Sequence, residues 1–238
     1  MTAFNALRPA PTAEAARVSP RLRTSAVLLT ASAAAAAAVT GLAEAAETQA
    51  GPSRLDPIVA ADVVGIRTPL LTALAHGFTF AGSEVVVGGL ALVLLVVLVV
   101  RGHRTRAATF AFGMAGSVAL TVIVKLLVAR ARPPALDRLG AVDATYAFPS
   151  GHTLNSAVLL VLATSLLWAG AKTRTRMALV TFDAVMVAGV ALSRVYLGYH
   201  WATDVLASGL VALAWLSLVW LLNPLLSRAV VRVLPGSC

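Results

Sequence analysis

Three short polar segments interrupt a strongly apolar chain, and their residue types suit the handling of a phosphate group. In sequence letters they are K-x6-R-P at 125–133, P-S-G-H at 149–152 and S-R-x5-H-x3-D at 193–204. Lysine and arginine donate to phosphate oxygens, histidine can attack phosphorus or transfer a proton near neutral pH, and a carboxylate can orient a histidine. This set of groups suits phosphoryl transfer, so the three segments together predict a phosphate-handling site.

The segment Pro149–His152 predicts a turn at the start of a helix. Proline, serine and glycine in a row do not sustain a strand or a helix interior, and an apolar run from Thr153 to Gly170 follows. The first N–H groups of a helix have no intrahelical partner, and with the helix dipole they favour a bound anion such as phosphate. His152 adds an acid or base that titrates near neutral pH. Taken alone, the string is equally compatible with a surface turn that carries an incidental histidine.

Lys125 and Arg132 are seven residues apart, which is almost two turns of a helix. We expect them to share a helix face, about 10 Å apart along the axis, with Pro133 ending the helix. The alternative is that Lys125 extends along the helix toward lipid head groups. Arg130 falls off the shared face, and we interpret it as an interfacial anchor.

His200 and Asp204 are four residues apart, so on a helix they would be neighbours on one face. The carboxylate could then hold one ring nitrogen and leave the other free to attack, which favours His200 as the nucleophile. Arg194, which precedes them in the sequence, can donate two hydrogen bonds to one oxyanion through its guanidinium. The alternative is that Arg194 and His200 belong to an interfacial belt and that Asp204 simply begins a helix.

The composition places this chemistry in a membrane. The chain has 238 residues, of which 59% are hydrophobic and 12% charged, whereas a soluble domain carries about 25% charged residues. The formal net charge of +9 resides in short clusters between apolar runs, which excludes a nucleic-acid-binding face and predicts contact with lipid head groups. The single cysteine, Cys238, excludes an internal disulfide, and no histidine or acidic cluster has metal-ligand spacing, so we expect no metal and no cofactor.

Six apolar stretches are long enough to cross a bilayer, so the sequence predicts an all-α, integral membrane six-helix bundle. The expected spans are 25–43, 84–100, 107–129, 153–171, 177–192 and 205–222. They form one domain, 25–222, whose site segments fall within 125–204, between a basic tail at 1–24 and a second tail at 223–238. The first stretch could instead be a signal peptide that is cleaved near Ala43-Glu44-Ala45.

The segments 58–66 and 70–80, between the first two spans, are too short to cross and predict interfacial helices or a loop that caps the bundle. The basic, acid-poor loops 101–106 and 172–176 alternate with the loops that carry the site, so both termini are predicted to be cytoplasmic and the site extracytoplasmic. The alanine-, valine- and arginine-rich composition suggests a bacterial plasma membrane. Nothing in the pattern predicts an oligomeric state.

In this order, the three segments resemble the signature of the type 2 phosphatidic acid phosphatase family, in its membrane branch. The matching residues are Lys125, Arg132, Pro133, Pro149, Ser150, Gly151, His152, Ser193, Arg194, His200 and Asp204. The resemblance implies that His200 forms a phosphohistidine and that Asp204 supports it. It further implies that His152 protonates the leaving oxygen and then activates water. Lys125, Arg132, Ser150, Gly151 and Arg194 would bind the phosphate.

The expected activity is therefore the hydrolysis of a lipid phosphate or diphosphate, with phosphatidic acid, phosphatidylglycerophosphate and polyprenyl diphosphate as candidate substrates. A lipid phosphotransferase would share the same phosphohistidine. A lipid transporter without catalysis would also explain six spans and the intramembrane Lys125 and Asp183, but no Gly/Pro-interrupted pair of spans indicates inverted repeats. Asp183 lies close enough to the cytoplasmic end to meet Arg106, Arg174 or Arg176.

Overall fold

The structure is a computed structural model that describes residues 20–141 and 143–233, and its regular structure in these ranges is entirely helical. Its elements are α1 (Pro20–Thr48), η1 (Gly51–Leu55), α2 (Asp56–Gly65), α3 (Pro69–Ala81), α4 (Glu84–Val100), α5 (Arg104–Val128), η2 (Ala135–Asp137), α6 (Gly151–Trp168), α7 (Thr173–Tyr196) and α8 (Ala202–Val233). Most of the basic tail expected at 1–24 and the last residues of the tail at 223–238 lie outside the described residues.

Five helices, α1, α5, α6, α7 and α8, are long and apolar enough to cross a membrane. The helices α3 and α4 meet at a bend of 41° and qualify only as a pair, which would make a sixth span. The expected span at 84–100 is α4, whose 17 residues reach about 25 Å and fall short of a hydrocarbon core of about 30 Å. The all-helical class and the multi-pass membrane character are thus confirmed, and the second crossing is more complex than predicted.

The helix α6 lies at the centre of the bundle, in contact with α4, α5, α7 and α8. Its apolar side chains, including Leu154 and Val158, pack with Phe110 and Val211 into one buried cluster. The outer faces of the bundle expose large apolar side chains such as Leu127, which suits a surface covered by lipid. Buried Asp183 of α7 hydrogen bonds with Thr164 of α6. Within the described residues it forms no ion pair with Arg106, Arg174 or Arg176, the contact considered from the sequence.

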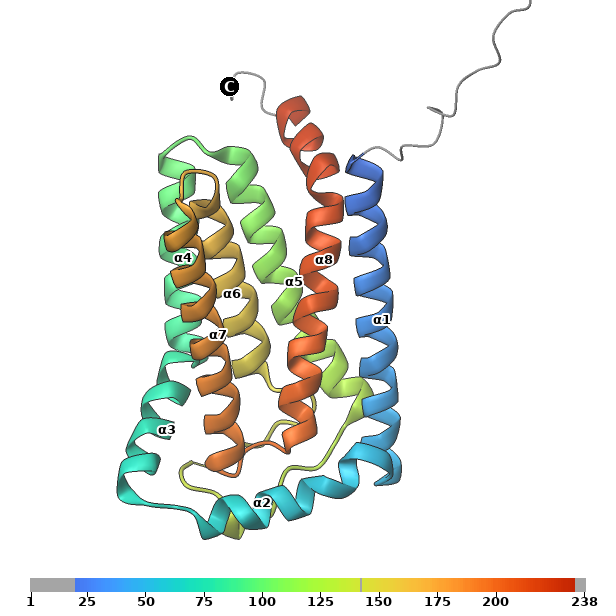
Figure 1. Cartoon of the computed structure of the whole chain (residues 1–238), viewed down its shortest axis with the longest axis vertical. Coiled ribbons are helices and arrows are strands. Elements are labelled where there is room, and N and C mark those ends of the chain that lie inside the picture. The colour runs from blue at the N-terminus through green and yellow to red at the C-terminus, as the bar shows by residue number, and fades with distance from the viewer. Residues whose placement is uncertain (1–19, 142, 234–238) are drawn as a thin grey trace, which may run out of the picture.

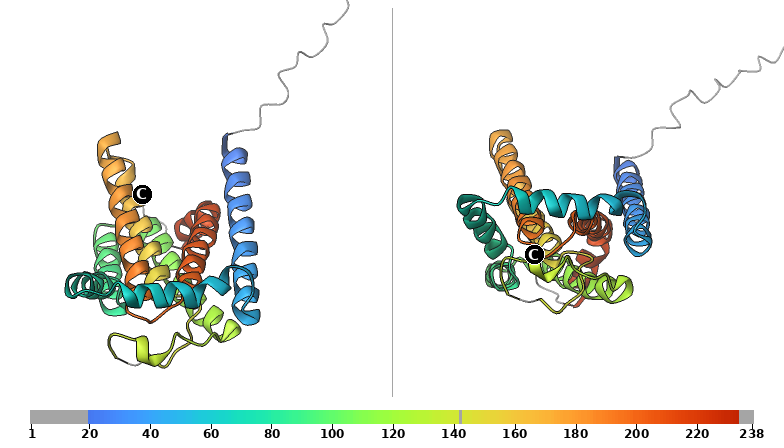
Figure 2. Two further views of the ribbon diagram at one scale, coloured as in Figure 1. Left: turned by 60° about the horizontal axis from the view of Figure 1, so that its bottom comes forward. Right: turned by 90° about the horizontal axis from the view of Figure 1, so that it is seen from below.

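The two ends of the bundle differ in structure. The turns that join α4 to α5 and α6 to α7 share one end with the start of α1 and the end of α8 (Figure 1). At the other end, α2 lies across the bundle next to the loops that enter α6 and α8 (Figure 2). The segments expected to be interfacial at 58–66 and 70–80 are helical, as α2 and α3.

Several helix boundaries differ from the prediction because polarity marks the end of an apolar span and not the end of a helix. The helix α7 continues to Tyr196, so Ser193 and Arg194 lie in its last turn and not in a loop. The helix α8 continues through Pro224, beyond the expected end at 222. The loop between α7 and α8 is therefore only 197–201, which holds the residues around His200 close to two rigid helix ends.

Candidate functional site

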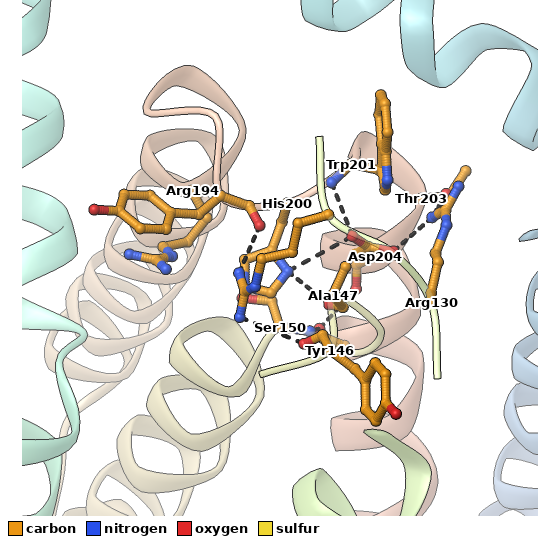
Figure 3. Close-up of polar contacts among 12 residues, drawn as sticks. Arg130, Tyr146, Ala147, Ser150, Arg194, His200, Trp201, Thr203 and Asp204 are labelled. Atoms are coloured by element: carbon orange, nitrogen blue, oxygen red, sulfur yellow. Dashed lines mark hydrogen bonds and ion pairs between the residues drawn. The ribbon is translucent and has the colours of Figure 1, made fainter. Parts of the chain in front are cut away.

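The three polar segments meet at the end of the bundle that α2 crosses. Lys125 projects from the last turn of α5, Arg132 follows it in the loop, and Gly151 and His152 begin α6. Arg194 lies in the last turn of α7, and Asp204 lies in the first turn of α8. Figure 3 shows how Arg194, His200 and Asp204 converge on this region. The three segments thus form one cluster although they are separate in sequence.

The ring of His200 is buried, and its neighbours determine which nitrogen carries the proton. Its Nδ1 lies 2.6 Å from the carbonyl oxygen of Ala147, which can only accept a hydrogen bond. Its Nε2 lies 3.4 Å from a guanidinium nitrogen of Arg132, which can only donate. The proton therefore resides on Nδ1, and the lone pair of Nε2 points into the cation cluster.

Asp204 lies on the Nδ1 side of this ring but is not its nearest hydrogen-bond acceptor. Its carboxylate lies 3.6 Å from Nδ1 of His200, which is farther than the carbonyl of Ala147. His200 precedes α8, so the two residues do not share a helix face as expected. Asp204 also accepts the N–H of Trp201 at 2.8 Å, and in this way it caps the first turn of α8. The capping role considered as an alternative and the orienting role thus occur together.

Burial lowers the pKa of His200 to about 4, and this effect exceeds the opposing effect of Asp204, which raises it. The arginines Arg194 and Arg132 add to the lowering because a second positive charge is unfavourable near them. The imidazole is therefore neutral over the physiological pH range. A neutral ring is the form that can attack phosphorus.

Arg132 is held in place by the loop that precedes α6. It donates to the carbonyl of Thr145 at 2.7 Å, to the carbonyl of Tyr199 at 2.6 Å and to the carboxylate of Asp143 at 2.6 Å. Burial lowers the pKa of Arg132, but the neighbouring Asp143 opposes this effect. For Asp143, burial raises the pKa, but bonds from Thr145 and the charge of Arg132 outweigh it and lower the pKa overall. Asp143 is thus an anion that contacts an arginine predicted to bind phosphate.

Lys125 reaches the same loop. Its Nζ donates to the hydroxyl of Thr145 at 3.1 Å and to the carbonyl of Tyr146. The helix α5 ends at Val128, and the next residue, Ala129, is left-handed with φ 47°. Lys125 and Arg132 therefore do not share a helix face as expected; they converge because the loop folds back onto both. Lys125 contacts protein groups at the site, contrary to the alternative of a free extension toward lipid.

Arg194 is buried and stacked, with its guanidinium carbon 4.0 Å from the centre of the Tyr199 ring. It donates to the hydroxyl of Thr79 of α3 at 2.8 Å, and its nearest contact with Asp143 is 4.0 Å. Its Nε has no hydrogen-bond partner among the described residues. A buried guanidinium with an unpaired donor can accept an oxyanion ligand at little cost.

The turn at the start of α6 is built as a helix N-terminus. Ser150 is the N-cap: its hydroxyl accepts from the N–H and the hydroxyl of Thr153, and its own N–H donates to the hydroxyl of Ser208. Gly151 is the next residue. A β-carbon at this position would lie 3.0 Å from a methyl carbon of Thr121, so a side chain here would press against α5. His152 interacts electrostatically with Arg194 and His200. The turn therefore brings a helix N-terminus and a second histidine to the cluster.

Several neighbours of the site were not predicted. The carbonyl of Ala147 carries no side-chain signal, and Thr79 belongs to a helix distant in sequence. Arg130 is not an interfacial anchor as expected, because it donates to Asp204 at 2.5 Å and to Asp56 at 2.7 Å. In the sequence, only its position between Lys125 and Arg132 links Arg130 to the site. A helix continuing through Arg132 would have placed Arg130 on a different face, which is why this role was not predicted.

Comparison with known proteins places these residues in a defined context. The family model of the PAP2 superfamily matches residues 106–228. Phosphatidylglycerophosphatase B of Escherichia coli strain K12 is 39% identical over 77 residues, which are 32% of this chain and 29% of that protein. The Shigella flexneri protein of the same name gives the same values. The aligned part thus spans less than a third of these curated relatives.

A solved structure resembles most of the chain. It is the crystal structure of a transmembrane PAP2 type phosphatidylglycerolphosphate phosphatase from Bacillus subtilis, which matches with a TM-score of 0.61 and 23% sequence identity. The match covers 86% of this chain and 98% of that one. At this identity the comparison establishes a common fold, including helices that the family model does not reach.

Proposed function

Since the chain belongs to the PAP2 superfamily, we propose that it is a metal-independent, membrane-embedded lipid phosphatase that acts through a phosphohistidine. The observation that supports this most directly is the lone pair on Nε2 of His200, which lies 3.4 Å from Arg132 within a cluster of cations. The substrate would be a phosphate or diphosphate monoester of a lipid: phosphatidic acid, phosphatidylglycerophosphate or polyprenyl diphosphate. The names of the relatives favour phosphatidylglycerophosphate among these.

In the first step, Nε2 of His200 attacks phosphorus, and the bond from phosphorus to the lipid oxygen breaks. The ring gains positive charge, which the carbonyl of Ala147 and the carboxylate of Asp204 stabilise from the Nδ1 side. His152 donates its proton to the leaving oxygen. In the second step, His152 takes a proton from water as the water attacks the phosphohistidine, and inorganic phosphate is released.

The phosphate oxygens would be bound by Lys125, Arg132 and Arg194, together with the hydroxyl of Ser150 and the N–H of Gly151. Two of these groups have capacity for a ligand. The Nε of Arg194 is unpaired among the described residues, and the first N–H groups of a helix such as α6 have no intrahelical partner. The carboxylate that now contacts Arg132 belongs to Asp143, and an incoming phosphate would displace it.

A lipid tail could lie in an apolar groove of about 800 Å³ between α6, α7 and α8. Its wall includes Ala157, which is six residues along α6 from Gly151 and so about 9 Å from the turn. Most other lining residues, such as Val187 and Leu213, are apolar as an acyl or prenyl chain requires, and the polar ones include the hydrogen-bonded pair Thr164 and Asp183. A groove of this kind explains why a small hydrolase would be embedded in the membrane.

The proposal includes a topology. Six crossings within 25–222, with the pair α3 and α4 as one of them, would place both tails in the cytoplasm of a cell with a single plasma membrane. The acid-free basic turns between α4 and α5 and between α6 and α7 support this orientation. The site would then face the extracytoplasmic side.

The direct test is phosphate release by the purified protein in detergent from the three candidate lipids. We expect hydrolysis of at least one of them, and we expect His200→Ala to abolish it because the bond-forming nitrogen is lost. Tyr146→Phe, which changes an exposed side chain near the site, is the matched control. Unchanged activity of His200→Ala would rule out the mechanism. Transfer of labelled phosphate to a second lipid would instead identify a phosphotransferase.

A further inference from the structure

Asp204, Arg130 and Asp56 form a group of three charged side chains. Figure 3 shows Arg130 on the side of Asp204 that faces away from His200. Arg130 donates to Asp204 at 2.5 Å through one terminal nitrogen and to Asp56 at 2.7 Å through the other. The side chains of Asp204, Asp56 and Arg130 are 0%, 2% and 10% exposed. One guanidinium therefore bridges two carboxylates that are almost fully buried.

Asp56 also fixes the start of α8. It accepts the N–H of Thr203 at 3.0 Å and the hydroxyl of Thr203 at 2.5 Å. Thr203 immediately precedes Asp204 in the first turn of the helix, where N–H groups lack intrahelical partners. Asp56 is the first residue of α2, so this contact joins α2 to the helix that carries Asp204.

The charges of the three side chains sum to −1. Arg130 alone would neutralise Asp204, and Asp56 restores the negative charge to the group. His200 gains positive charge when it attacks phosphorus, and a net negative group 3.6 Å behind its ring stabilises that charge. Burial strengthens the effect because the local dielectric is low.

We infer that Arg130 and Asp56 are positioning residues for the reaction: they orient Asp204 and keep the group behind His200 at a net charge of −1. The inference rests on the proposed function for its kinetic consequence. Arg130 contacts Asp204 directly, and Asp56 contacts Arg130 and the neighbouring Thr203, so both act through Asp204. Asp56 lies outside the part of the chain that the family model matches.

Three variants separate charge from simple structural support. Asp56→Asn brings the net charge to zero, Arg130→Gln brings it to −2, and the double variant returns it to −1. We expect each single variant to lower kcat by about 10- to 100-fold with KM unchanged, the range found for carboxylates that orient metal-bound histidines. Asp56→Asn removes the negative charge that stabilises the ring in the transition state, whereas Arg130→Gln leaves a charge of −2 that favours a protonated ring, which cannot attack. We expect the double variant to exceed both singles. In an Asp204→Asn background, Asp56→Asn should change kcat little, since it acts through the missing carboxylate.

The matched control is Arg54→Gln, which removes an exposed arginine from the neighbouring η1. The ring ¹⁵N signals of His200 give a readout that needs no substrate. We expect the ¹⁵N shifts of the two single variants to be opposite in sign and those of the double variant to return to the wild-type values.

Wild-type kcat in both single variants would overturn the inference, and so would a double variant whose loss of kcat is the product of the two single losses. If the variants show these ¹⁵N shifts but the wild-type protein hydrolyses no lipid phosphate, the proposed function alone is overturned. Asp56→Asn keeps the shape of the side chain. If Arg130→Gln does not fold, the kcat and the ¹⁵N shift of Asp56→Asn alone test the inference.

Discussion

At the scale of single residues, the chemistry of the site depends on which nitrogen of His200 is free. The carbonyl of Ala147 and the guanidinium of Arg132 leave one arrangement, with the proton on Nδ1 and the lone pair on Nε2. Such a ring is useful only if it stays neutral among cations. Burial ensures this, because it opposes the protonation that Asp204 would otherwise favour.

The protonation of His200 gives a prediction with a definite sign. A pKa lowered to about 4 means that the ring stays neutral down to that pH, whereas an ordinary histidine protonates near pH 6.5. Asp204→Asn removes a group that raises this pKa, so the variant should titrate at a still lower pH. NMR titration of the histidine rings measures this directly, with His200→Gln to assign the signal. NMR titration is preferable to the pH dependence of the rate, because a substrate phosphate itself titrates near pH 6.

A titration of His200 near pH 6.5 in the folded protein would contradict the buried environment described above. The same shift also affects stability. The unfolded chain binds the proton near pH 6.5 and the folded protein does not until about pH 4, so the free energy of unfolding should decrease as the pH falls between these values.

At the scale of elements, the loop between α5 and α6 acts as a scaffold for the cations. It presents the carbonyls of Thr145 and Tyr146 to Lys125 and Arg132, and it places the carboxylate of Asp143 on Arg132. The carboxylate contacts an arginine that we propose binds a phosphate oxygen. It is also 4.0 Å from Arg194, as a bridging anion would be.

We therefore predict that Asp143 competes with substrate. Asp143→Asn should lower KM and the inhibition constant of orthovanadate by about tenfold, the value of one hydrogen bond to a charged group. Steady-state kinetics with vanadate as a competitive inhibitor measures both. The control is Asp62→Asn, which removes an exposed carboxylate from α2. Weaker binding in Asp143→Asn would mean that the loop needs this ion pair to hold Arg132 in place.

The sequence predicted the elements and the site to different extents. Hydropathy located the five long apolar helices but not the bent pair of α3 and α4, and three motifs located the cations, the histidines and Asp204. It did not predict that α5 ends before Arg132 or that His200 precedes α8, because the assumed helix continued through both segments. The pairing of Arg130 with Asp56 spans 74 residues and depends on the placement of α2. No local pattern encodes such a contact.

At the scale of the whole molecule, the charges at the two ends of the bundle are organised differently. The turns at 101–103 and 169–172 and the helix starts that follow them carry arginines and a lysine without neighbouring acids. At the site end, Arg130 and Arg132 are matched by Asp56 and Asp143 in ion pairs. Among the described residues, the basic turns of the first end are the ones without acidic neighbours, and such loops are the ones usually retained in the cytoplasm.

This asymmetry predicts which end can be labelled from outside the cell. Cys238 is the only cysteine, so a Cys238→Ser background leaves the chain free of thiols. A cysteine replacing Leu136, which is 97% exposed in η2 at the site end, should react with a membrane-impermeant maleimide on intact cells. A cysteine replacing His103, exposed in the turn between α4 and α5, should react only after permeabilisation. The reverse result would place the site in the cytoplasm, and its substrate would then have to come from the inner leaflet.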